Sequence, residues 1–283
     1  MINRAISAAR AIWYGATEPA RLRLARAANE HRFWTSGAVA PFFPDGYPTQ
    51  WENPLVSVIV PTHNRVDLLM DRFLPSVLAY GQTYNWIEVI IAAHGCTDDT
   101  VPAVLALGDH RVRVIEVPRK RTYPPTPENH WFAGPVAPLN AALAECRGFW
   151  VARADDDDVW TLDHIASLLR FAQAGGFEFV SARHETHKGP VEPYDLAGIK
   201  VGGCQTWLYR DYLKFMRYNP DCWRRRWNRV NDTDLQRRFL SAGVRMGYLD
   251  RVVAKVLPRP GETAVGLEAY LKGGAARRMA FGG

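Results

Sequence analysis

Four consecutive aspartates are the residues of this chain best suited to chemistry. Asp155, Asp156, Asp157 and Asp158 follow an apolar run at residues 149–152. Four adjacent like charges repel one another, so at least one carboxyl tends to stay protonated unless a positive group lies among them. Carboxylate oxygens are also the ligands that hard cations such as Mg²⁺ and Mn²⁺ prefer. The run therefore predicts a cation site suited to a diphosphate. The alternative is an exposed acidic turn before the next helix.

Composition restricts the class of protein. The chain has 283 residues, which allows one large or two small domains, and 47% of them are hydrophobic. No stretch approaches the ~20 apolar residues of a membrane span. The first 13 residues lack the long apolar segment of a secretory signal. The four cysteines form no closely spaced pair, which is typical of reduced thiols and not of a zinc site or disulfide frame. We therefore expect a cytoplasmic protein with a substantial core.

The charge balance favours an anionic partner. The net charge is +6 and the isoelectric point is about 9.2. Basic residues gather in the first 32 residues, at residues 223–229 and at residues 277–278, the first two interleaved with tryptophan. Arginine mixed with aromatic rings suits a membrane interface, and a solvated surface is the alternative. A peripheral contact with the inner membrane face is one expectation.

The elements that must position the aspartates follow from hydrophobic patterning. Between residues 55 and 158, short apolar runs alternate with segments of helical spacing, which is typical of a parallel α/β sheet. We expect strands at residues 55–60, 86–92, 112–117 and 149–154, and helices at residues 66–80, 97–107 and 136–146. Ligands bind beyond the carboxyl ends of such strands. Residues 61–65, residues 93–96 and the aspartate run lie there.

The remaining segments are less regular. Residues 1–34 predict one or two helices, broken near Gly15 and Pro19, and residues 118–135 form an unusually long loop. In the second half we expect helices at residues 162–174, 209–217 and 232–242, and strands at residues 177–183, 245–249 and 252–257.

The order of motifs resembles the inverting GT-A glycosyltransferases of family two. The matching segments are VIVPTHNR at residues 58–65, AHGCTD at 93–98, LNAA at 139–142, DDDDVW at 155–160 and NDTDL at 231–235. The resemblance as a whole covers about residues 54–260. The chain departs from the pattern twice: His94 stands where the family usually has an aspartate that reads a uridine base, and Asn231 replaces a glutamate before Asp232.

The resemblance implies an α/β fold of the Rossmann-like GT-A type, with a mostly parallel central sheet flanked by helices. It divides the chain into an N-terminal helical extension and linker at residues 1–53, a nucleotide-sugar-binding half at 54–158, an acceptor-binding half at 159–262 and a tail at 263–283.

The resemblance also assigns roles to residues. Asp232 is the expected catalytic base, and Asp157 with Asp155 is the expected metal site, a D-x-D motif for Mn²⁺ or Mg²⁺. The expected nucleotide-binding residues are Pro61, Thr62, Asn64, Arg65, His94, Asp155 and Asp156. The expected acceptor-binding residues are Trp131, Gly203, Trp207 and Asp234. Ordinary turn chemistry is the alternative for Pro61, Thr62 and Asn64, and a structural role at a helix start is the alternative for Asp232 and, more strongly, for Asp234.

The implied partners are a nucleotide-diphosphate sugar, with UDP ahead of GDP or dTDP, and a saccharide or glycolipid acceptor. No nucleic-acid partner is expected. The implied activity is metal-assisted glycosyl transfer with inversion, in assembly of a bacterial surface polysaccharide or glycolipid.

Two alternatives remain open at this stage. One is a haloacid-dehalogenase-like phosphatase with Asp155 and Asp157 in its nucleophile motif, although three strand patterns precede that motif here. The other is a degenerate transferase fold that acts as a binding module, which Ala93, His94 and Asn231 would favour.

Overall fold

The computed structural model describes residues 2–35, 53–78, 82–119, 124, 126–224 and 229–272, without the side chains of residues 2–16 and 127. Of the basic residues noted above, Arg277 and Arg278 in the tail and Arg225 and Arg226 of the segment 223–229 lie outside the described residues.

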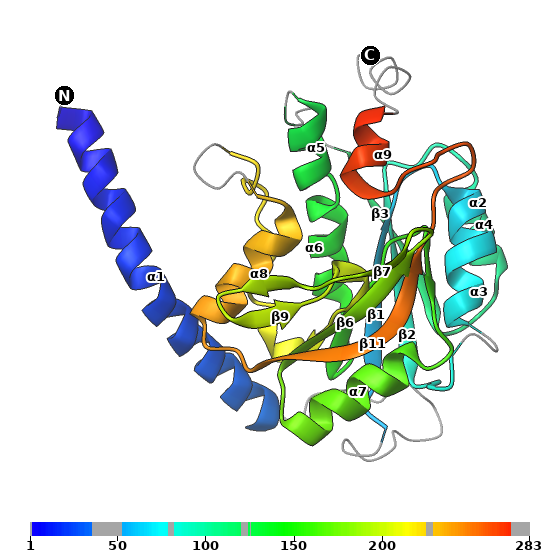
Figure 1. Cartoon of the computed structure of the whole chain (residues 1–283), viewed down its shortest axis with the longest axis horizontal. Coiled ribbons are helices and arrows are strands. Elements are labelled where there is room, and N and C mark those ends of the chain that lie inside the picture. Colours follow the sequence, from blue (N-terminus) through cyan, green and yellow to red (C-terminus); the bar gives the residue numbers. More distant parts are fainter. Residues whose placement is uncertain are drawn as a thin grey trace.

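A curled nine-stranded sheet forms the centre of the described part of the chain (Figure 1). The strands are β1 (Val56–Thr62), β2 (Ile87–His94), β3 (Val112–Val117), β4 (Trp150–Arg153), β5 (Asp158–Trp160), β6 (Phe179–Thr186), β7 (Gly189–Val191), β10 (Leu208–Arg210) and β11 (Met246–Val256). Their order is β3-β2-β1-β4-β10-β6-β11-β5, with β7 paired to β6. A separate hairpin joins β8 (Tyr194–Leu196) to β9 (Ile199–Val201).

Most neighbouring strands in the order β3-β2-β1-β4-β10-β6-β11-β5 pair in parallel. β1, β2, β3 and β4 pair in parallel, as do β6 and β11, whereas β10 runs antiparallel between β4 and β6. The chain builds outward from β1 to β3 and then returns to the other side of β1 with β4. This reversal is the topological switch point, where open α/β sheets bind ligands. The predicted fold class is thereby confirmed.

Helices cover both faces of the sheet (Figure 1). They are α2 (Val66–Leu68), the π-helical turn η1 (Leu69–Phe73), α3 (Leu74–Val77), α4 (Thr100–Ala106), α5 (Pro127–Ala133), α6 (Val136–Glu145), α7 (His164–Gly175), α8 (Asn231–Ser241) and α9 (Gly266–Lys272). Because alternate residues of a strand point to opposite faces, Val58 packs with Phe73 and Ile165, whereas Ile59 packs with Leu139 on the other side.

The N-terminal segment is one helix, α1 (Ile2–Thr35), with Pro19 inside it. The predicted break near Gly15 and Pro19 is therefore wrong. The second half of α1 packs against the domain: Arg26 makes a bidentate ion pair with buried Glu178 at 2.7 and 2.8 Å, and the ring of Phe33 meets that of Phe149 edge-on at 5.4 Å. The first half extends away from the domain (Figure 1). Within the described ranges, no helix combines the length and hydrophobicity that a membrane crossing requires.

Two predictions about the second half are wrong. Residues 209–217 do not form a helix but the short strand β10 and a 3₁₀ turn, η3 (Asp211–Leu213). Tyr209 is buried between β4 and β6, and its ring centroid lies 5.5 Å from that of Phe239. Its segment therefore belongs to the sheet. The two strands predicted at 245–257 are a single strand, β11, whose pairing with β6 shifts register near Val252.

Candidate functional site

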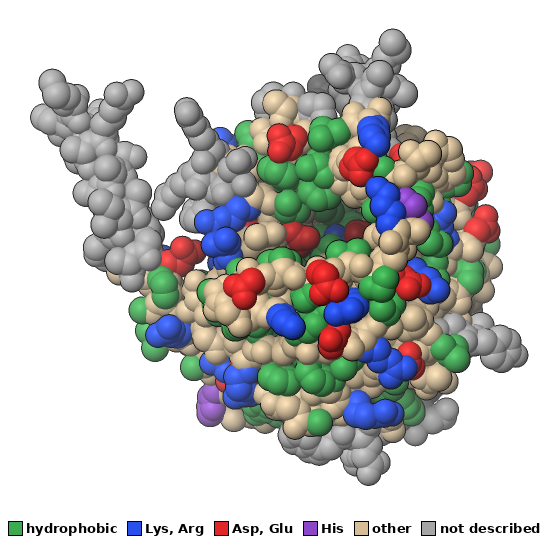
Figure 2. Space-filling view, in the orientation of Figure 1, with side chains coloured by type: hydrophobic (Ala, Val, Ile, Leu, Met, Phe, Trp, Pro, Cys, Tyr) green, Lys and Arg blue, Asp and Glu red, His purple; other side chains and the backbone are tan. Residues whose placement is uncertain are grey.

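A cavity of about 450 Å³ opens at the carboxyl ends of β1 and β4, on the face seen in Figure 2. Its wall includes the turn after β1, all four aspartates and the start of α8. It also includes parts of α5 and α9, which pack against each other. The sheet's switch point therefore lies at the cavity, as the strand order predicts.

The turn after β1 is fixed to the turn after β2. Asn64 adopts a positive φ of 50°, a conformation that asparagine tolerates better than most residues. Its side-chain Oδ1 accepts a hydrogen bond from the Thr97 amide at 2.7 Å, and its Nδ2 donates to Thr97 Oγ1 at 3.1 Å. Pro61, Thr62 and Arg65 line the cavity, whereas Asn64 is not part of its wall. Asn64 thus positions its neighbours.

Neutral histidines line the cavity next to this turn. Arg119 donates to His63 Nε2 at 3.1 Å, which assigns the ring proton to Nδ1, and Nδ1 donates to the carbonyl of His94 at 2.7 Å. Burial, reinforced by Arg119, lowers the pKa of His63. Burial and the neighbouring positive groups lower the pKa values of His94 and His130 to about 4. All three rings are therefore uncharged at neutral pH, and a neutral ring offers one donor and one acceptor.

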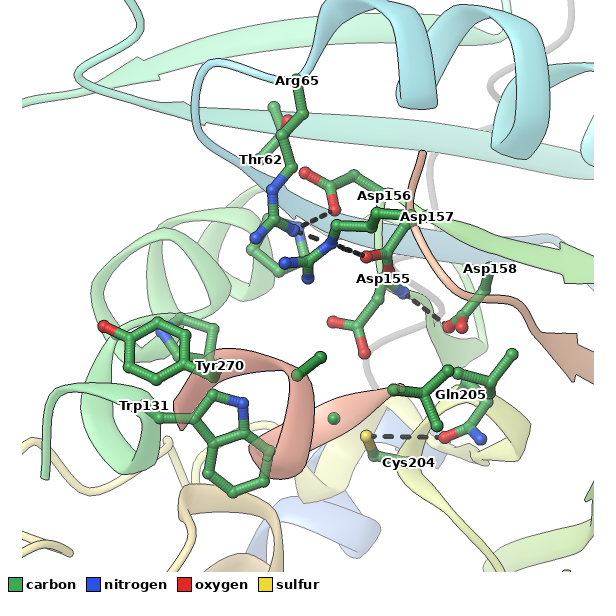
Figure 3. A pocket seen from close by; sticks show the side chains of 18 of the residues that line it. Thr62, Arg65, Trp131, Asp155, Asp156, Asp157, Asp158, Cys204, Gln205 and Tyr270 are labelled. Atoms are coloured by element: carbon green, nitrogen blue, oxygen red, sulfur yellow. Dashed lines mark hydrogen bonds and ion pairs between the residues drawn. The ribbon is translucent and has the colours of Figure 1, made fainter. Parts of the chain in front are cut away.

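Two of the aspartates are held by arginines that come from distant segments (Figure 3). Asp156 Oδ1 lies 2.7 Å from Nη1 of Arg65. Asp157 Oδ2 lies 2.7 Å from Nε of Arg259 and 3.8 Å from Nη1 of Arg65. Burial raises the pKa of Asp156 in spite of Arg65. Burial also opposes ionisation of Asp157, but Arg259 and Arg65 outweigh it and hold the pKa of Asp157 below its usual value.

The other two aspartates differ from each other. Asp155 pairs with buried Arg153 at 2.7 Å, and its side chain keeps 36% of its surface exposed. Asp158 is the first residue of β5 and is buried, and its Oδ2 accepts a hydrogen bond from the Asp155 amide at 3.2 Å. Burial, then repulsion from Asp155 and Asp157, raises the pKa of Asp158 well above the usual range. The Asp158 carboxyl therefore resists ionisation and supports the loop through its hydrogen bond from the Asp155 amide.

The predicted base lies on the same cavity wall. Asp232 is in the first turn of α8, and its Oδ1 accepts a hydrogen bond from the Thr233 amide at 2.6 Å. Burial raises the pKa of Asp232, and the nearby Arg153 offsets part of that rise. Its neighbour Asn231 donates through Nδ2 to the Phe132 carbonyl at 2.8 Å, which ties the start of α8 to α5.

The structure brings two of the four expected acceptor residues to the cavity. Trp131, on α5, and Gly203 line it, whereas Trp207 and Asp234 do not. Trp207 is fully buried and donates to the Gly202 carbonyl at 3.1 Å. Asp234 is buried and pairs with Arg238 one helical turn later, at 2.9 Å. The side chains of these two residues are thus used in packing and pairing within the fold.

Sequence reasoning missed several residues of the wall. The missed residues are Arg153, His184, Arg259 and Tyr270. Tyr270 lies on α9, in the segment expected to be a tail, and its ring centroid is 6.3 Å from that of His130. In Figure 3 Trp131 and Tyr270 lie side by side, across the cavity from Arg65. The one local signal for Arg259 is a proline on each side, after the last strand.

The donor set of the acidic loop fits a hard divalent cation. Asp155 and Asp157 both face the cavity and offer only oxygen atoms. Asp157 Oδ2 is engaged by Arg259, but a carboxylate has a second oxygen with its own acceptor sites. Within the described ranges, no cluster of three or more acidic, histidine or cysteine side chains is placed to bind a metal. The site therefore suits a cation such as Mg²⁺, which proteins bind through one or two carboxylates, waters and substrate phosphates.

The fold and the cavity define a GT-A type of α/β protein, and comparison with solved structures agrees. The chain is similar to S. aureus TarS in complex with UDP-GlcNAc, with a TM-score of 0.56 and 19% sequence identity. The match covers 74% of this chain and 61% of that one. It is also similar to the mannosyltransferase PcManGT from Pyrobaculum calidifontis in complex with GDP-Man and Mn²⁺: TM-score 0.53, 18% identity, covering 92% and 75%. Identities this low establish the fold alone.

The chain belongs to Glycosyl transferase family 2, whose family model matches residues 57–125 and 127–236. It is 32% identical over 124 residues to succinoglycan biosynthesis protein ExoO of Rhizobium meliloti, covering 44% of this chain and 31% of that protein. It is 29% identical over 119 residues to the Escherichia coli glucosyltransferase WfaP, covering 42% and 41%. The chain thus spans less than half the length of these relatives. The family membership confirms the predicted resemblance and replaces the phosphatase alternative.

Proposed function

We propose that the protein transfers a sugar from a nucleotide-diphosphate sugar to a hydroxyl group, with inversion at the anomeric carbon. The observation that carries this proposal is the shared cavity: the aspartate run and Asp232 line one space of about 450 Å³. That volume lies within the range of pockets that bind small ligands.

The chemistry requires a proton acceptor and a charged leaving group. Asp232 takes the proton from the acceptor hydroxyl, whose oxygen attacks the anomeric carbon, and the bond from that carbon to the diphosphate breaks. The nucleoside diphosphate leaves with the bonding electrons. The raised pKa of Asp232 makes it a stronger base than an ordinary aspartate.

The donor lies, in this proposal, across the switch point. Pro61, Thr62 and Arg65 contact the nucleotide, with Asn64 holding their turn, and His94 lies where a base edge would be read. Asp155 and Asp156 line the cavity beside them and complete the nucleotide contacts.

Mn²⁺ or Mg²⁺ would be held by Asp157 and Asp155. As a Lewis acid, the cation would neutralise the negative charge of the diphosphate. The D-x-D spacing and the lowered pKa of Asp157 support this assignment, because an ionised carboxylate is the form that binds a cation. The Mn²⁺ in the PcManGT complex supports the same class of ion.

The similar proteins suggest the substrate class. WfaP is named as a UDP-Glc-dependent glucosyltransferase acting on a diphosphoundecaprenol-linked sugar, and ExoO as a succinoglycan biosynthesis protein. We infer a UDP-sugar donor ahead of GDP or dTDP, and a saccharide or glycolipid acceptor of a bacterial surface polysaccharide. Trp131 and Gly203 would face that acceptor.

A peripheral membrane contact through the first half of α1 is part of the proposal, because that half extends from the domain and carries Arg4, Arg10 and Trp13. Deletion of residues 2–16 tests this part. Loss of co-sedimentation with anionic vesicles is expected, and unchanged co-sedimentation would remove the membrane contact from the proposal.

Titration with UDP-, GDP- and dTDP-sugars, with Mn²⁺ or with a chelator, tests the main proposal. We expect Mn²⁺-assisted binding of one nucleotide class and slow hydrolysis of the donor in the absence of acceptor. Binding without any turnover would favour a degenerate transferase fold that acts as a binding module. Failure to bind any of the three donors would overturn the proposal.

A further inference from the structure

We propose that Arg259 and Arg65 form a clamp on the diphosphate of the donor, and that Asp157 holds this clamp in place until the donor binds. The inference rests on the proposed function and adds a residue, Arg259, that lies beyond the segment matched by the family.

The two arginines reach the same carboxylate from opposite ends of the chain. Arg65 follows β1 and Arg259 follows β11, yet both have a nitrogen within 4 Å of Asp157 Oδ2, at 3.8 and 2.7 Å respectively. Both line the cavity, and their side chains keep 33% and 25% of their surface exposed. Both arginines therefore lie at the wall of the space where a diphosphate would lie beside the aspartates, and Figure 3 shows Arg65 next to Asp156 and Asp157.

The arginines of this corner already offset the charge of the aspartates before any ligand binds. Arg65, Arg72, Arg153 and Arg259 all contact the aspartate run, so four positive charges meet at most four negative ones, and burial disfavours the ionised form of Asp158. The corner is thus not a purely acidic site that would bind cations alone. A donor brings two negative charges, and the leaving nucleoside diphosphate carries one more, which needs an added positive partner.

Arginine is well suited to supply that partner. Its planar guanidinium binds phosphate oxygens in a bidentate manner and stays charged at any working pH. If a cation engages Asp157, the guanidinium of Arg259 loses its partner and can pair with the phosphate instead. Exchange of one ion pair for another keeps the charge balance, which avoids the large cost of an unpaired buried charge.

The segment that carries Arg259 is held independently of the Arg259 side chain. Arg72 donates to the backbone carbonyls of Asp157 at 3.4 Å, Leu257 at 3.2 Å and Pro258 at 3.2 Å. Removal of the Arg259 guanidinium therefore leaves the backbone of this segment attached to the acidic loop. A substitution at this position tests ligand binding and not merely the local fold.

The experiment compares Arg259→Gln with the unaltered protein by calorimetric titration with UDP and UMP, and with GDP and GMP, in Mn²⁺ and in a chelator. We expect the diphosphate to bind roughly tenfold or more weakly, the worth of one charge-assisted hydrogen bond, and the monophosphate to change little. Arg259→Lys, which keeps the charge but loses the bidentate geometry, is expected to recover part of the affinity. Arg251→Gln is the matched control. Arg251 lies in β11, eight residues before Arg259, and pairs with Asp163 outside the cavity.

Each outcome has a clear meaning. Selective loss of diphosphate binding in Arg259→Gln, absent in Arg251→Gln, supports the clamp. Equal losses for diphosphate and monophosphate would show that Arg259 only shapes the cavity, and unchanged binding would show that it does neither; both results overturn the inference. If the unaltered protein binds no nucleotide, the proposed function itself fails, and that result is seen before any variant is measured.

Discussion

Two carboxylates of one cavity, Asp157 and Asp232, have opposite electrostatic surroundings. Asp157 lies against the guanidinium groups of Arg259 and Arg65, which outweigh its burial and lower its pKa. Asp232 is partly buried, but within the described ranges no cation lies within ion-pair distance of it, and its pKa is raised. The nearby Arg153 is already engaged, 2.7 Å from Asp155.

The comparison shows how a fold gives the same residue type two tasks. A carboxylate that stays ionised at every working pH suits a fixed electrostatic role beside a diphosphate, whereas one with a raised pKa suits proton transfer. The difference comes from which arginines reach each side of the cavity. It does not come from the aspartates themselves, nor from their local sequence.

The largest effect is expected from removal of the base. Asp232→Asn keeps the size and the hydrogen bond from the Thr233 amide but cannot accept a proton. We expect kcat to fall by about 10²–10⁴-fold, the usual worth of general base catalysis, while the donor binds as before. Steady-state kinetics with a donor-binding titration separates the two quantities.

Asp234→Asn is the matched control for that change. Asp234 lies two residues along the same helix, outside the cavity, and is paired with Arg238. Its substitution should lower the melting temperature and leave kcat within a few-fold. Comparable losses of kcat in both variants would show that the start of α8 has a structural role only, and the comparison with Asp157 would lose its basis.

A second, smaller effect concerns pH. Because the pKa of Asp232 is raised, this carboxylate becomes protonated, and kcat falls, at a higher pH than an ordinary aspartate of pKa 3.8 would give. Because the pKa of Asp157 is lowered, Asp157 remains ionised there. We therefore expect a range of mildly acidic pH in which the donor still binds but is not transferred. Parallel pH profiles of kcat and of donor affinity would measure this range, and coinciding acid limbs would contradict the contrast between the two residues.

The strands of the first half could be predicted because their apolar runs are continuous and buried. β1, β2 and β4 lie in the middle of the sheet, so residues such as Val58, Ile90 and Val151 are apolar regardless of the face they occupy. The same local patterns placed Pro61 and the aspartates at strand ends, and hence at the cavity.

The partners of those aspartates could not be predicted, because they depend on tertiary contacts. Arg259 meets Asp157 across 102 positions of sequence, through a segment that follows the last strand. The segment at residues 209–217 gave a similar difficulty: its apolar residues fit helical spacing, but Leu208–Arg210 fills a place in the sheet between β4 and β6 that the local pattern does not reveal. The sequence around Arg259 or Tyr209 does not specify which distant segment the residue meets.

The smallest effect should come from Asp158, the neighbour of Asp157 that has neither task. Its raised pKa, caused by burial and then by repulsion from Asp155 and Asp157, means that the folded state favours the protonated form. A group with a raised folded-state pKa contributes stability at low pH, and this stability is lost as the pH rises through that value.

Asp158→Asn keeps an acceptor for the Asp155 amide and does not titrate. At pH 8 we therefore expect a stabilisation on the order of 1 kcal/mol, or a rise in melting temperature of about 2–4 °C, that shrinks toward pH 4. Thermal unfolding at both pH values measures the difference, and a shift that does not depend on pH would mean that Asp158 ionises as freely as an exposed aspartate.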